Sequence, residues 1–251
     1  MNIIENKDKA VNILYKGLEE LNITISKEQE EKLFIYYDML IEKNKVMNLT
    51  AITELEEVVV KHFLDSLSVI KAIEGRILNS NIKVIDVGTG AGFPGIPLKI
   101  VFPELDITLL DSLNKRLVFL NEVIDELDLH NISTVHGRCE DIGRDIKYRE
   151  KYNLCVSRAV ANLSTLSELC IPFVKTGGLF VSYKAGDSDE EIKNAEFAVS
   201  KLGGKIKDIV KFNLPNSDLG RTFVIIEKSK ETPKGYPRKA GTPLKEPLNK
   251  R

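Results

Sequence analysis

The sequence predicts an α/β fold, with a seven-stranded, mostly parallel, Rossmann-like sheet and an antiparallel last strand, preceded by an N-terminal helical region. Three observations support this prediction. The first eighty residues carry apolar side chains at helical spacing. From Lys83 onward, short apolar segments alternate with helical segments, a pattern typical of parallel sheets covered on both faces. The last two strand segments are separated only by residues 215–220, too few for a parallel crossover, so they must form an antiparallel hairpin.

The N-terminal region, residues 1–80, is expected to form amphipathic helices packed on the sheet. Ser26 and Gln29 form a capping-box pattern before one long helix. Thr53 and Glu56 repeat the pattern before "LEEVVVKHFLDSLSVI". In that segment four apolar residues share one helical face: Val59, Phe63, Leu67 and Ile70.

The core region, residues 81–229, contains the predicted sheet. We expect strands over 83–88, 106–110, 133–136, 153–157 and 178–184, and helices near 95–102, 114–128, 163–174 and 188–202. The hairpin strands are "KIKDIVKFNL" and "RTFVIIEKS". One domain is expected overall, with residues 230–251 as a tail.

Composition excludes several classes of protein. With 43% hydrophobic and 29% charged residues, the chain matches an ordinary globular protein, and no run of eighteen apolar residues predicts a membrane span. Three cysteines fit neither a disulfide framework nor a C-x-x-C metal site, so we expect a cytoplasmic protein without a bound metal. Nothing requires a protein partner or more than a monomer.

The tail is basic. From Lys228 onward there are eight basic residues and two acids, which gives the tail a charge of about +6 and the rest of the chain about −7. Such a tail is either a solvated terminus or an arm that neutralises nucleic-acid phosphates. Its interleaved glycines and prolines exclude a regular helix.

The segment "KVIDVGTGAGFPGIPLKIV" (83–101) is a strand, a glycine-rich turn and a helix, and it matches two cofactor patterns. Gly90, Gly92 and Gly95 form G-x-G-x-x-G, the dinucleotide pattern. Asp86 and Gly88, followed by Gly90 and Gly92, form D-x-G-x-G-x-G, the pattern of S-adenosylmethionine sites.

Two features favour S-adenosylmethionine over a nicotinamide dinucleotide. The closing antiparallel strand is typical of methyltransferases, whereas nicotinamide-binding sheets are parallel to their edge. A dinucleotide turn also needs its first glycine directly after the strand and its third against the strand. Counted from Gly88 that third position is Phe93, and counted from Gly90 the motif lies two residues too late.

Three further residues are candidate cofactor contacts. Asp111 ends the second strand, where an acid accepts ribose hydroxyls; the alternative is that it caps the next helix. In "GRCEDI", the Cys139 backbone and the Glu140 side chain follow the third strand, where methyltransferases bind adenine; the alternative for Glu140 is the surface.

The fourth strand ends in Ser157 and Arg158 without the Asn/Asp-Pro-Pro-aromatic segment of exocyclic amine methyltransferases. Cys155 and Cys170 are expected in the core and not as nucleophiles. The remaining target is an atom that is already nucleophilic, such as N7 of guanine, which needs positioning and no general base. Arg158 and, ending the fifth strand, Lys184 are candidates to orient substrate, although either residue could be a salt-bridge partner instead.

Several segments resemble the bacterial glucose-inhibited division protein B family, the 16S rRNA guanine-N7 methyltransferases. These are "MNLTAI" (47–52), "KHFLDSL" (61–67), "VIDVGTGAGFPGIPL", "VSRAVANL" and "YPRKAGTPLKEPL". The resemblance implies methyl transfer from S-adenosylmethionine to N7 of a guanosine in 16S rRNA, with the small ribosomal subunit or its precursor as partner.

The resemblance also implies roles for particular residues. Cofactor contacts carry over to Gly88, Phe93, Cys139, Glu140 and Arg158. Asn48 and Thr50 are placed over the mouth of the site, where Asn48 is a further candidate to orient the substrate; the alternative is that both residues cap or turn the chain before the next helix. The tail becomes an RNA-facing arm, and the basic residues predicted to contact RNA are Arg221 in the core and Arg238, Lys239 and Lys245 in the tail.

Three alternatives stay open on the sequence alone. The first is a methyltransferase for another RNA position, a small molecule or a protein. The second is a nicotinamide-dependent oxidoreductase. The third is a catalytically silent RNA-binding subunit with a vestigial pocket, against which the intact glycine turn argues.

Overall fold

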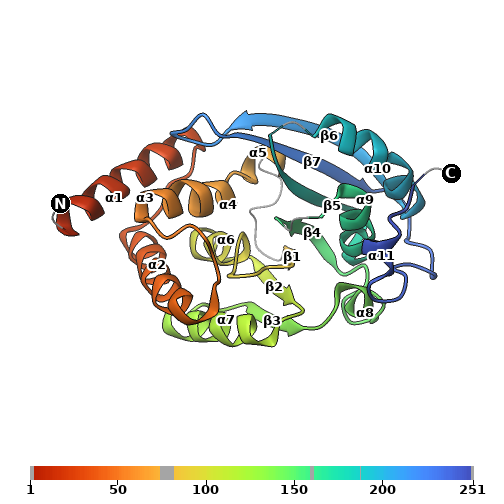
Figure 1. The fold of residues 1–251 in the computed structure, drawn as a ribbon, viewed down its shortest axis with the longest axis horizontal. Helices are drawn as coiled ribbons and strands as arrows, with labels where there is room; N and C mark the ends of the chain where they lie inside the picture. The colour runs from red at the N-terminus through yellow and green to blue at the C-terminus, as the bar shows by residue number, and fades with distance from the viewer. Residues whose placement is uncertain (1–2, 74–81, 159–160, 187, 250–251) are drawn as a thin grey trace.

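The computed structural model describes residues 3–73, 82–158, 161–186 and 188–249 and contains a seven-stranded sheet (Figure 1). The strand order is β3-β2-β1-β4-β5-β7-β6. The strands are β1 (Lys83–Val87), β2 (Asp106–Asp111), β3 (Ile132–His136), β4 (Tyr152–Ser157), β5 (Val174–Ala185), β6 (Gly204–Asn213) and β7 (Gly220–Lys228). Strand β7 runs antiparallel to both β5 and β6, whereas the other pairs are parallel. The predicted reversed last strand is confirmed.

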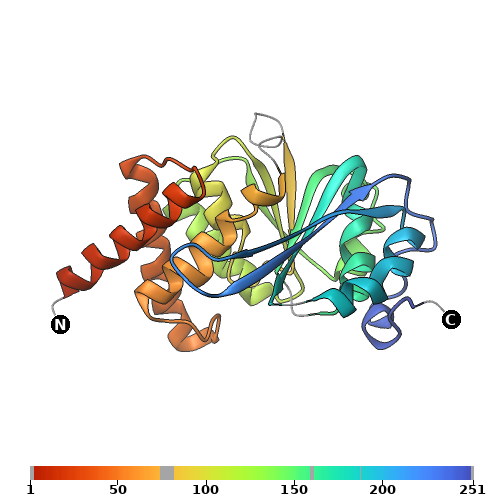
Figure 2. The ribbon, with the colours of Figure 1, turned by 90° about the horizontal axis from the view of Figure 1, so that it is seen from above.

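Helices cover both faces of the sheet (Figures 1 and 2). The helices of the core are α6 (Gly95–Val101), α7 (Asn114–Glu126), α8 (Cys139–Ile142), α9 (Leu163–Cys170), the 3-10 helix η2 (Ile171–Phe173) and α10 (Asp189–Lys201). Successive strand residues point to opposite faces, so Val84 joins one buried cluster with α6 and α7 while Ile85 joins another with α9 and α10. The carboxyl ends of the parallel strands are thereby left as the open edge.

The N-terminal helices pack on one of these faces and share its hydrophobic core. They are α1 (Ile3–Glu20), α2 (Lys27–Met47), α3 (Leu55–Val58), the π-helix η1 (Val59–Leu64), α4 (Asp65–Leu67) and α5 (Ile70–Ile73). Buried side chains such as Leu14, Leu33 and Phe63 contribute to that core. The predicted region boundary at residues 80 and 81 lies outside the described residues and stays a prediction.

The first predicted capping box is confirmed and the second is wrong. The Ser26 hydroxyl accepts from the Gln29 N–H (3.1 Å), and the Gln29 side chain accepts from the Ser26 N–H (2.8 Å). Helix α3 instead begins at Leu55, with Glu54 as N-cap and no side-chain cap. The Thr53 carbonyl accepts from the Tyr37 hydroxyl (3.0 Å), so tertiary contact and not local capping fixes this turn.

The predicted single helix over residues 55–70 is interrupted by η1, one π-helical turn followed directly by α4. Val59, Phe63 and Leu67 are buried as predicted. The wider turn also brings His62 and Asp65 inward, where they are 8% and 5% exposed. Such π-turns are frequent at functional sites, and this one turns polar side chains toward the strand ends.

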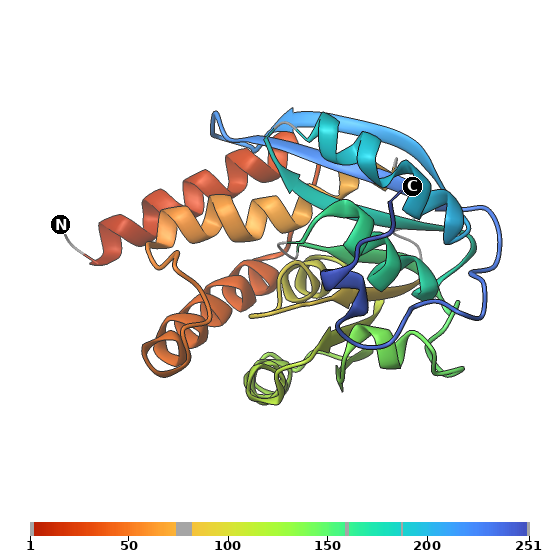
Figure 3. The ribbon, with the colours of Figure 1, turned by 45° about the vertical axis from the view of Figure 1, so that its right-hand side comes forward.

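The tail is folded against the body of the protein (Figure 3). Arg149 donates to the carbonyls of Thr232 (2.6 Å) and Tyr236 (2.7 Å), and Arg144 donates to the Pro237 carbonyl (2.7 Å). One helical turn, α11 (Thr242–Lys245), forms despite the prediction of no regular helix, because a proline fits the first turn of a helix. Across the described residues, no helix has both the length and the apolar character needed to cross a bilayer.

Substitution of Gly92 measures how closely the glycine turn packs against the helices behind it. A Cβ at Gly92 (φ +105°) would lie 2.7 Å from Ile96 and 2.8 Å from both Leu120 and the Tyr36 hydroxyl. We expect Gly92→Ala to lower the free energy of unfolding by about 3 kcal/mol, through backbone strain and overpacking. Gly177→Ala (φ +83°), where nothing lies within 4 Å, carries only the backbone cost of about 1 kcal/mol. Urea unfolding measures both variants, and equal losses would contradict a packing role for Gly92.

Candidate active site

A cavity of about 620 Å³ lies at the carboxyl ends of the parallel strands. The loop after α2 forms one wall through Leu49 and Thr50. The glycine turn and the ends of β2 and β4 form the floor. The folded tail contributes Gly241 and Leu244 on the far side. The cavity is therefore assembled from the N-terminal region, the core and the tail together.

Asp86, at the end of β1, organises the glycine turn from beneath. One of its oxygens accepts from the Thr89 hydroxyl (2.7 Å) and the Gly95 N–H (2.9 Å). The other has no hydrogen-bond partner among the described residues, and burial raises the pKa of this carboxyl to about 6. Gly88 (φ +73°) and Gly90 (φ +62°) line the cavity, and a Cβ at Gly90 would meet nothing closer than 4.0 Å. The backbone at these glycines is thus open to close approach by a ligand.

Gly92, a predicted cofactor contact, does not line the cavity. The space where its side chain would lie is filled by Ile96, Leu120 and Tyr36. It belongs to the cofactor motif because the turn must pack closely against the helices behind it.

Asp111 lines the cavity at the end of β2. Its Oδ2 accepts from the Gly90 N–H (2.9 Å) and from Arg116 (3.3 Å), and its Oδ1 accepts from the Leu113 N–H (2.9 Å). A carboxylate offers about four acceptor positions, so one position on Oδ1 is left for a ribose hydroxyl. The alternative expected from the sequence, that Asp111 caps the next helix, is wrong: Leu113 is the N-cap of α7 and no side chain caps that helix, while Asp111 accepts from the Leu113 N–H in the turn before it.

Cys139 and Glu140 form the wall beyond β3. Glu140 is 7% exposed, and its carboxylate accepts from the Gly241 N–H (2.8 Å) of the tail. The alternative surface position for Glu140 is therefore wrong. Burial raises the pKa of the Cys139 thiol, and likewise that of Cys155, so neither thiol is a nucleophile at neutral pH.

Arg158 reaches the cavity from the end of β4 and is held by the N-terminal region. Its Nη1 donates to Asp65 (2.6 Å) and to the Lys61 carbonyl (3.3 Å), and its Nη2 donates to His62 Nδ1 (3.1 Å). The guanidinium also lies 5.3 Å from the centre of the Phe93 ring. These contacts fix its orientation before any ligand binds.

His62 lines the cavity between Thr50 and Arg158. Its ring stacks on Phe93 with centroids 4.3 Å apart, and its Nε2 lies 2.9 Å from the Thr50 hydroxyl. Burial, and then the neighbouring Arg158 cation, lower the pKa of His62 to about 3. The imidazole is therefore neutral at physiological pH and a very weak base.

Two predicted substrate-orienting residues do not line the cavity. Lys184 pairs with Glu191 (2.6 Å) and donates to the Ala161 carbonyl (2.7 Å). Asn48 ends α2 in a left-handed conformation (φ +49°), with its N–H donating to the Asn44 carbonyl. The alternatives given for these residues are therefore the ones that the structure supports: Lys184 is a salt-bridge partner, and Asn48 caps the end of α2.

The predicted RNA contacts divide into two pairs. Arg221 donates to the buried Asp65 (2.9 Å), and Arg238 forms a fork-like pair with Glu168, which is fully buried. Both arginines therefore have intramolecular partners. Lys239 and Lys245 are exposed.

Four titratable residues of the site were not expected from the sequence: His62, Asp65, Arg116 and Arg138. Asp65 holds Arg158, while Arg116 and Arg138 line the cavity beside Asp111. The His-x-x-Asp spacing of residues 62 and 65 was a usable signal, because residues three apart share a helix face. No local pattern marks the two arginines, which reach the cavity only through the sheet order.

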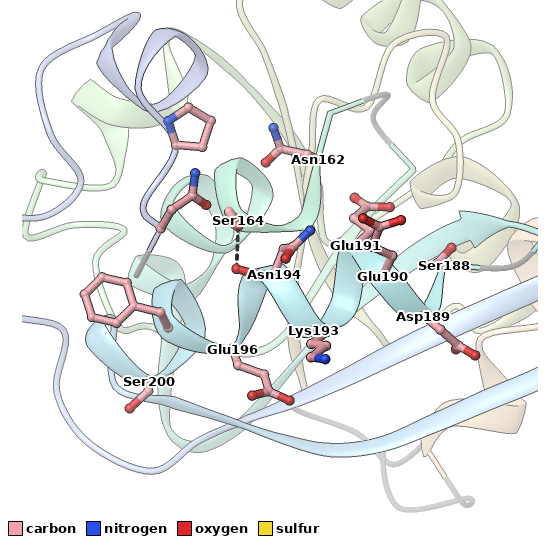
Figure 4. Close-up of a pocket in the computed structure, with 13 residues that line it drawn as sticks. Asn162, Ser164, Ser188, Asp189, Glu190, Glu191, Lys193, Asn194, Glu196 and Ser200 are labelled. Atoms are coloured by element: carbon pink, nitrogen blue, oxygen red, sulfur yellow. Dashed lines mark hydrogen bonds between the residues drawn. The ribbon is translucent and has the colours of Figure 1, made fainter. Parts of the chain in front are cut away.

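A larger depression of about 1380 Å³ lies elsewhere, over α10, the start of α9 and the end of the tail (Figure 4). Four carboxylates and one ammonium group line it: Asp189, Glu190, Glu191, Glu196 and Lys193. This charge disfavours an anionic ligand such as RNA, and none of the glycine-turn residues takes part. Nor does any group of three or more His, Cys, Asp or Glu side chains suited to a metal ion occur among the described residues.

A glycine turn after β1, an acid with a free acceptor position after β2 and a reversed β7 define the class of S-adenosylmethionine-dependent methyltransferases. A family model, GidB, described as rRNA small subunit methyltransferase G, matches residues 29–219. The chain belongs to this family, which confirms the resemblance and the predicted class of enzyme.

Relatives cover nearly the whole chain. The chain is 55% identical over 233 residues to ribosomal RNA small subunit methyltransferase G of Lachnoclostridium phytofermentans, covering 93% of this chain and 95% of the relative. It is 53% identical over 244 residues to the protein of the same name from Acetivibrio thermocellus, covering 97% and 99%. The crystal structure of TrmN from Thermus thermophilus is similar in fold alone, with 13% identity, a TM-score of 0.50 and coverage of 68% and 53%.

The neutral, buried His62 predicts a pH-dependent contribution to stability. Its folded pKa of about 3 lies below the ordinary value of 6.5, so the unfolded chain binds the extra proton and stability is lost as pH falls below about 6.5. From pH 7 to pH 5, the difference in unfolding free energy between the wild type and His62→Gln should change by about 2 kcal/mol, to the disadvantage of the wild type. Urea titrations at several pH values measure this, and parallel pH curves would contradict the buried neutral imidazole.

Proposed function

We propose that the chain transfers the methyl group of S-adenosylmethionine to N7 of a guanosine in the 16S rRNA of the small ribosomal subunit. Membership of the family and the names of the relatives support an rRNA substrate. The position on the base is supported by the chemistry of the cavity.

The observation that carries this proposal is that the titratable side chains at the cavity are already engaged: Asp111 accepts from Gly90, Leu113 and Arg116, Glu140 accepts from Gly241, and His62 lies against Arg158. His62 is the one imidazole among the described residues that line the cavity, and its pKa of about 3 makes it unable to deprotonate a substrate. Guanine N7 carries a lone pair that is free at neutral pH and loses no proton on methylation. A site that positions its substrate without a general base fits such an acceptor.

Cofactor and base have distinct places in this proposal. S-adenosylmethionine supplies an electrophilic methyl group on a sulfonium centre. Asp111 accepts from a ribose hydroxyl, while the backbone at Gly88 and Gly90 allows close approach to the methionine and ribose portions. Cys139 and Glu140 lie on the adenine side. Arg158, fixed over Phe93, orients the substrate or the cofactor carboxylate, and the neighbouring Thr50 and His62 form the wall on the substrate side.

The RNA-contacting residues that we propose differ from the four basic residues expected from the sequence. Arg221 and Arg238 stabilise the fold, so we assign phosphate contact to Lys239, Lys245 and the exposed Arg138 at the cavity. The tail is folded and presents Lys239 and Lys245 in place, which avoids the entropy cost of ordering an arm on binding. A cytoplasmic monomer without a protein partner is part of the proposal.

The activity itself is tested with small subunits from a strain that lacks this gene. Purified wild-type protein and S-adenosylmethionine should add one N7-methylguanosine to 16S rRNA, detected by nucleoside mass spectrometry. Gly90→Val is the matched control: its side chain enters the cavity, and we expect methyl transfer to fall more than a hundredfold as the cofactor is blocked.

Other outcomes identify the alternatives. Methylation at another atom, or of another RNA, would show that the protein is a methyltransferase with a different substrate. Binding of NAD but not of S-adenosylmethionine in calorimetry would replace the methyltransferase assignment. Subunit binding without turnover would indicate a silent RNA-binding protein.

The two tail lysines predict the salt dependence of RNA binding. Each phosphate contact contributes about 0.7–0.9 to the slope of log K against log salt, so Lys239→Gln with Lys245→Gln should flatten the slope by roughly 1.5. Lys205→Gln with Lys207→Gln on β6 is the control, because it removes the same charge from two lysines that are likewise exposed. Binding to small subunits between 50 and 200 mM salt (roughly the range in which such slopes are read) measures both, and equal slopes for the two double variants would remove the tail from the RNA interface.

A further inference from the structure

The Thr50 side chain lines the cavity and is held more rigidly than its position in a loop suggests. The Asn44 side chain donates to the Thr50 carbonyl (2.9 Å) and accepts from the Thr50 N–H (2.9 Å). The Thr50 hydroxyl oxygen in turn accepts from the Ile52 N–H (3.0 Å) and contacts His62 Nε2 (2.9 Å). Four hydrogen bonds therefore fix both the backbone and the hydroxyl of this residue.

The direction of the hydrogen bond between Thr50 and His62 follows from Arg158. Arginine only donates: Arg158 Nη1 contacts Asp65 (2.6 Å) and the Lys61 carbonyl (3.3 Å), and Nη2 contacts His62 Nδ1 (3.1 Å). His62 Nδ1 must therefore be the acceptor. The alternative, Nδ1–H donating to the Lys61 carbonyl (3.1 Å), would set an imidazole N–H against a guanidinium N–H. Since the imidazole is neutral, its single proton lies on Nε2 and is donated to Thr50.

In this arrangement the Thr50 hydroxyl can still donate one hydrogen bond but cannot accept another. A hydroxyl has two acceptor positions and one proton. The Ile52 N–H and the His62 Nε2–H occupy both acceptor positions, so only the proton is available to another group. No described residue accepts it, and Thr50 borders the cavity. Thr50 is therefore a donor with a fixed direction, unlike an ordinary hydroxyl, which can donate or accept.

We infer that the Thr50 hydroxyl donates a hydrogen bond to O6 of the target guanine and thereby selects guanine over adenine, an inference that rests on the proposed function. Guanine carries the acceptor O6 next to N7, whereas adenine carries an amino group there. A hydroxyl that can only donate forms a hydrogen bond with guanine O6. With adenine, the same hydroxyl proton would face the amino group, which is also a donor. The contact to O6 leaves the N7 lone pair free for the methyl group.

The relay from Arg158 through His62 to Thr50 also gives the N-terminal loop its role in the reaction. Thr50 is the residue that touches the substrate, whereas His62 and Arg158 position its proton. The hydrogen bonds of the Thr50 hydroxyl go to Ile52 and His62, and none of them goes to Asp111 or the glycine turn, where the cofactor is placed. Loss of the Thr50 proton should therefore affect the base and not the affinity for S-adenosylmethionine.

The test uses full-length protein and small subunits reconstituted with either guanine or 2-aminopurine at the methylated position. 2-Aminopurine keeps N7 but has no O6. For the wild type, kcat/KM should be ten- to a hundredfold lower with 2-aminopurine. Thr50→Val should show the same loss with guanine and no further loss with 2-aminopurine, whereas Thr50→Ser should stay within about threefold of the wild type. Calorimetry should give the same affinity for S-adenosylmethionine in all three proteins.

Two results would overturn the inference while leaving the proposed function intact. One is equal wild-type rates with guanine and 2-aminopurine, which needs no variant to fold. The other is a proton on His62 Nδ1, read from ¹⁵N chemical shifts of the imidazole in the wild type and assigned with His62→Gln. If the wild type methylates no N7 of guanine at all, the proposed function fails and this inference with it.

Discussion

The structure depends on one buried carboxylate, that of Asp65, which pairs with two arginines from different strands. Arg158 comes from the end of β4 and Arg221 from the start of β7, and Asp65 itself begins α4 of the N-terminal region. A buried charge with only one of its partners is strongly destabilising, so the three groups must come together as a unit. Their meeting fixes the helical region over the strand ends, and it is this position that brings Thr50 and His62 to the cavity. The N-terminal region therefore supplies one wall of the cavity, through Leu49, Thr50 and His62.

On the other side of the cavity, buried carboxylates likewise hold the tail in place. Glu168 is fully buried and accepts both the backbone N–H and the guanidinium of Arg238, while Glu140 accepts from the Gly241 N–H. Net charge alone left the tail as either a solvated terminus or an arm for nucleic acid, and two of the four cations expected to bind RNA, Arg221 and Arg238, instead pair with buried carboxylates. In the proposed function, phosphate contact is therefore assigned to a small set of exposed cations on a folded surface. Specificity can then come from the shape of the substrate and from the donor at Thr50, with charge supplying the general attraction.

Local sequence patterns predicted the parts of the fold that local physics controls. The strand positions, the reversed β7 and the Ser26 capping box all follow from periodicity, connection length and capping chemistry. Strand β5 was predicted over 178–184 and is longer, Val174–Ala185, because pairing with β4 and β7 extends it beyond its apolar stretch. The capping signal at Thr53 and the unbroken helix after it were wrong, since tertiary hydrogen bonds there outweigh local preference.

The sequence by itself determined the architecture, the cofactor turn with Asp86, Gly88 and Gly90, the acid at Asp111 and the family. These depend on residues close together in the chain, where spacing is enough to fix geometry. Only the tertiary structure decided which charged residues are available, because a partner such as Asp65 lies 93 residues from Arg158 and 156 from Arg221. The same holds for the π-turn that directs His62 and for the orientation of the Thr50 proton. Which group donates and which accepts depends on all the partners in the hydrogen-bond network, and these partners come together only in the folded protein.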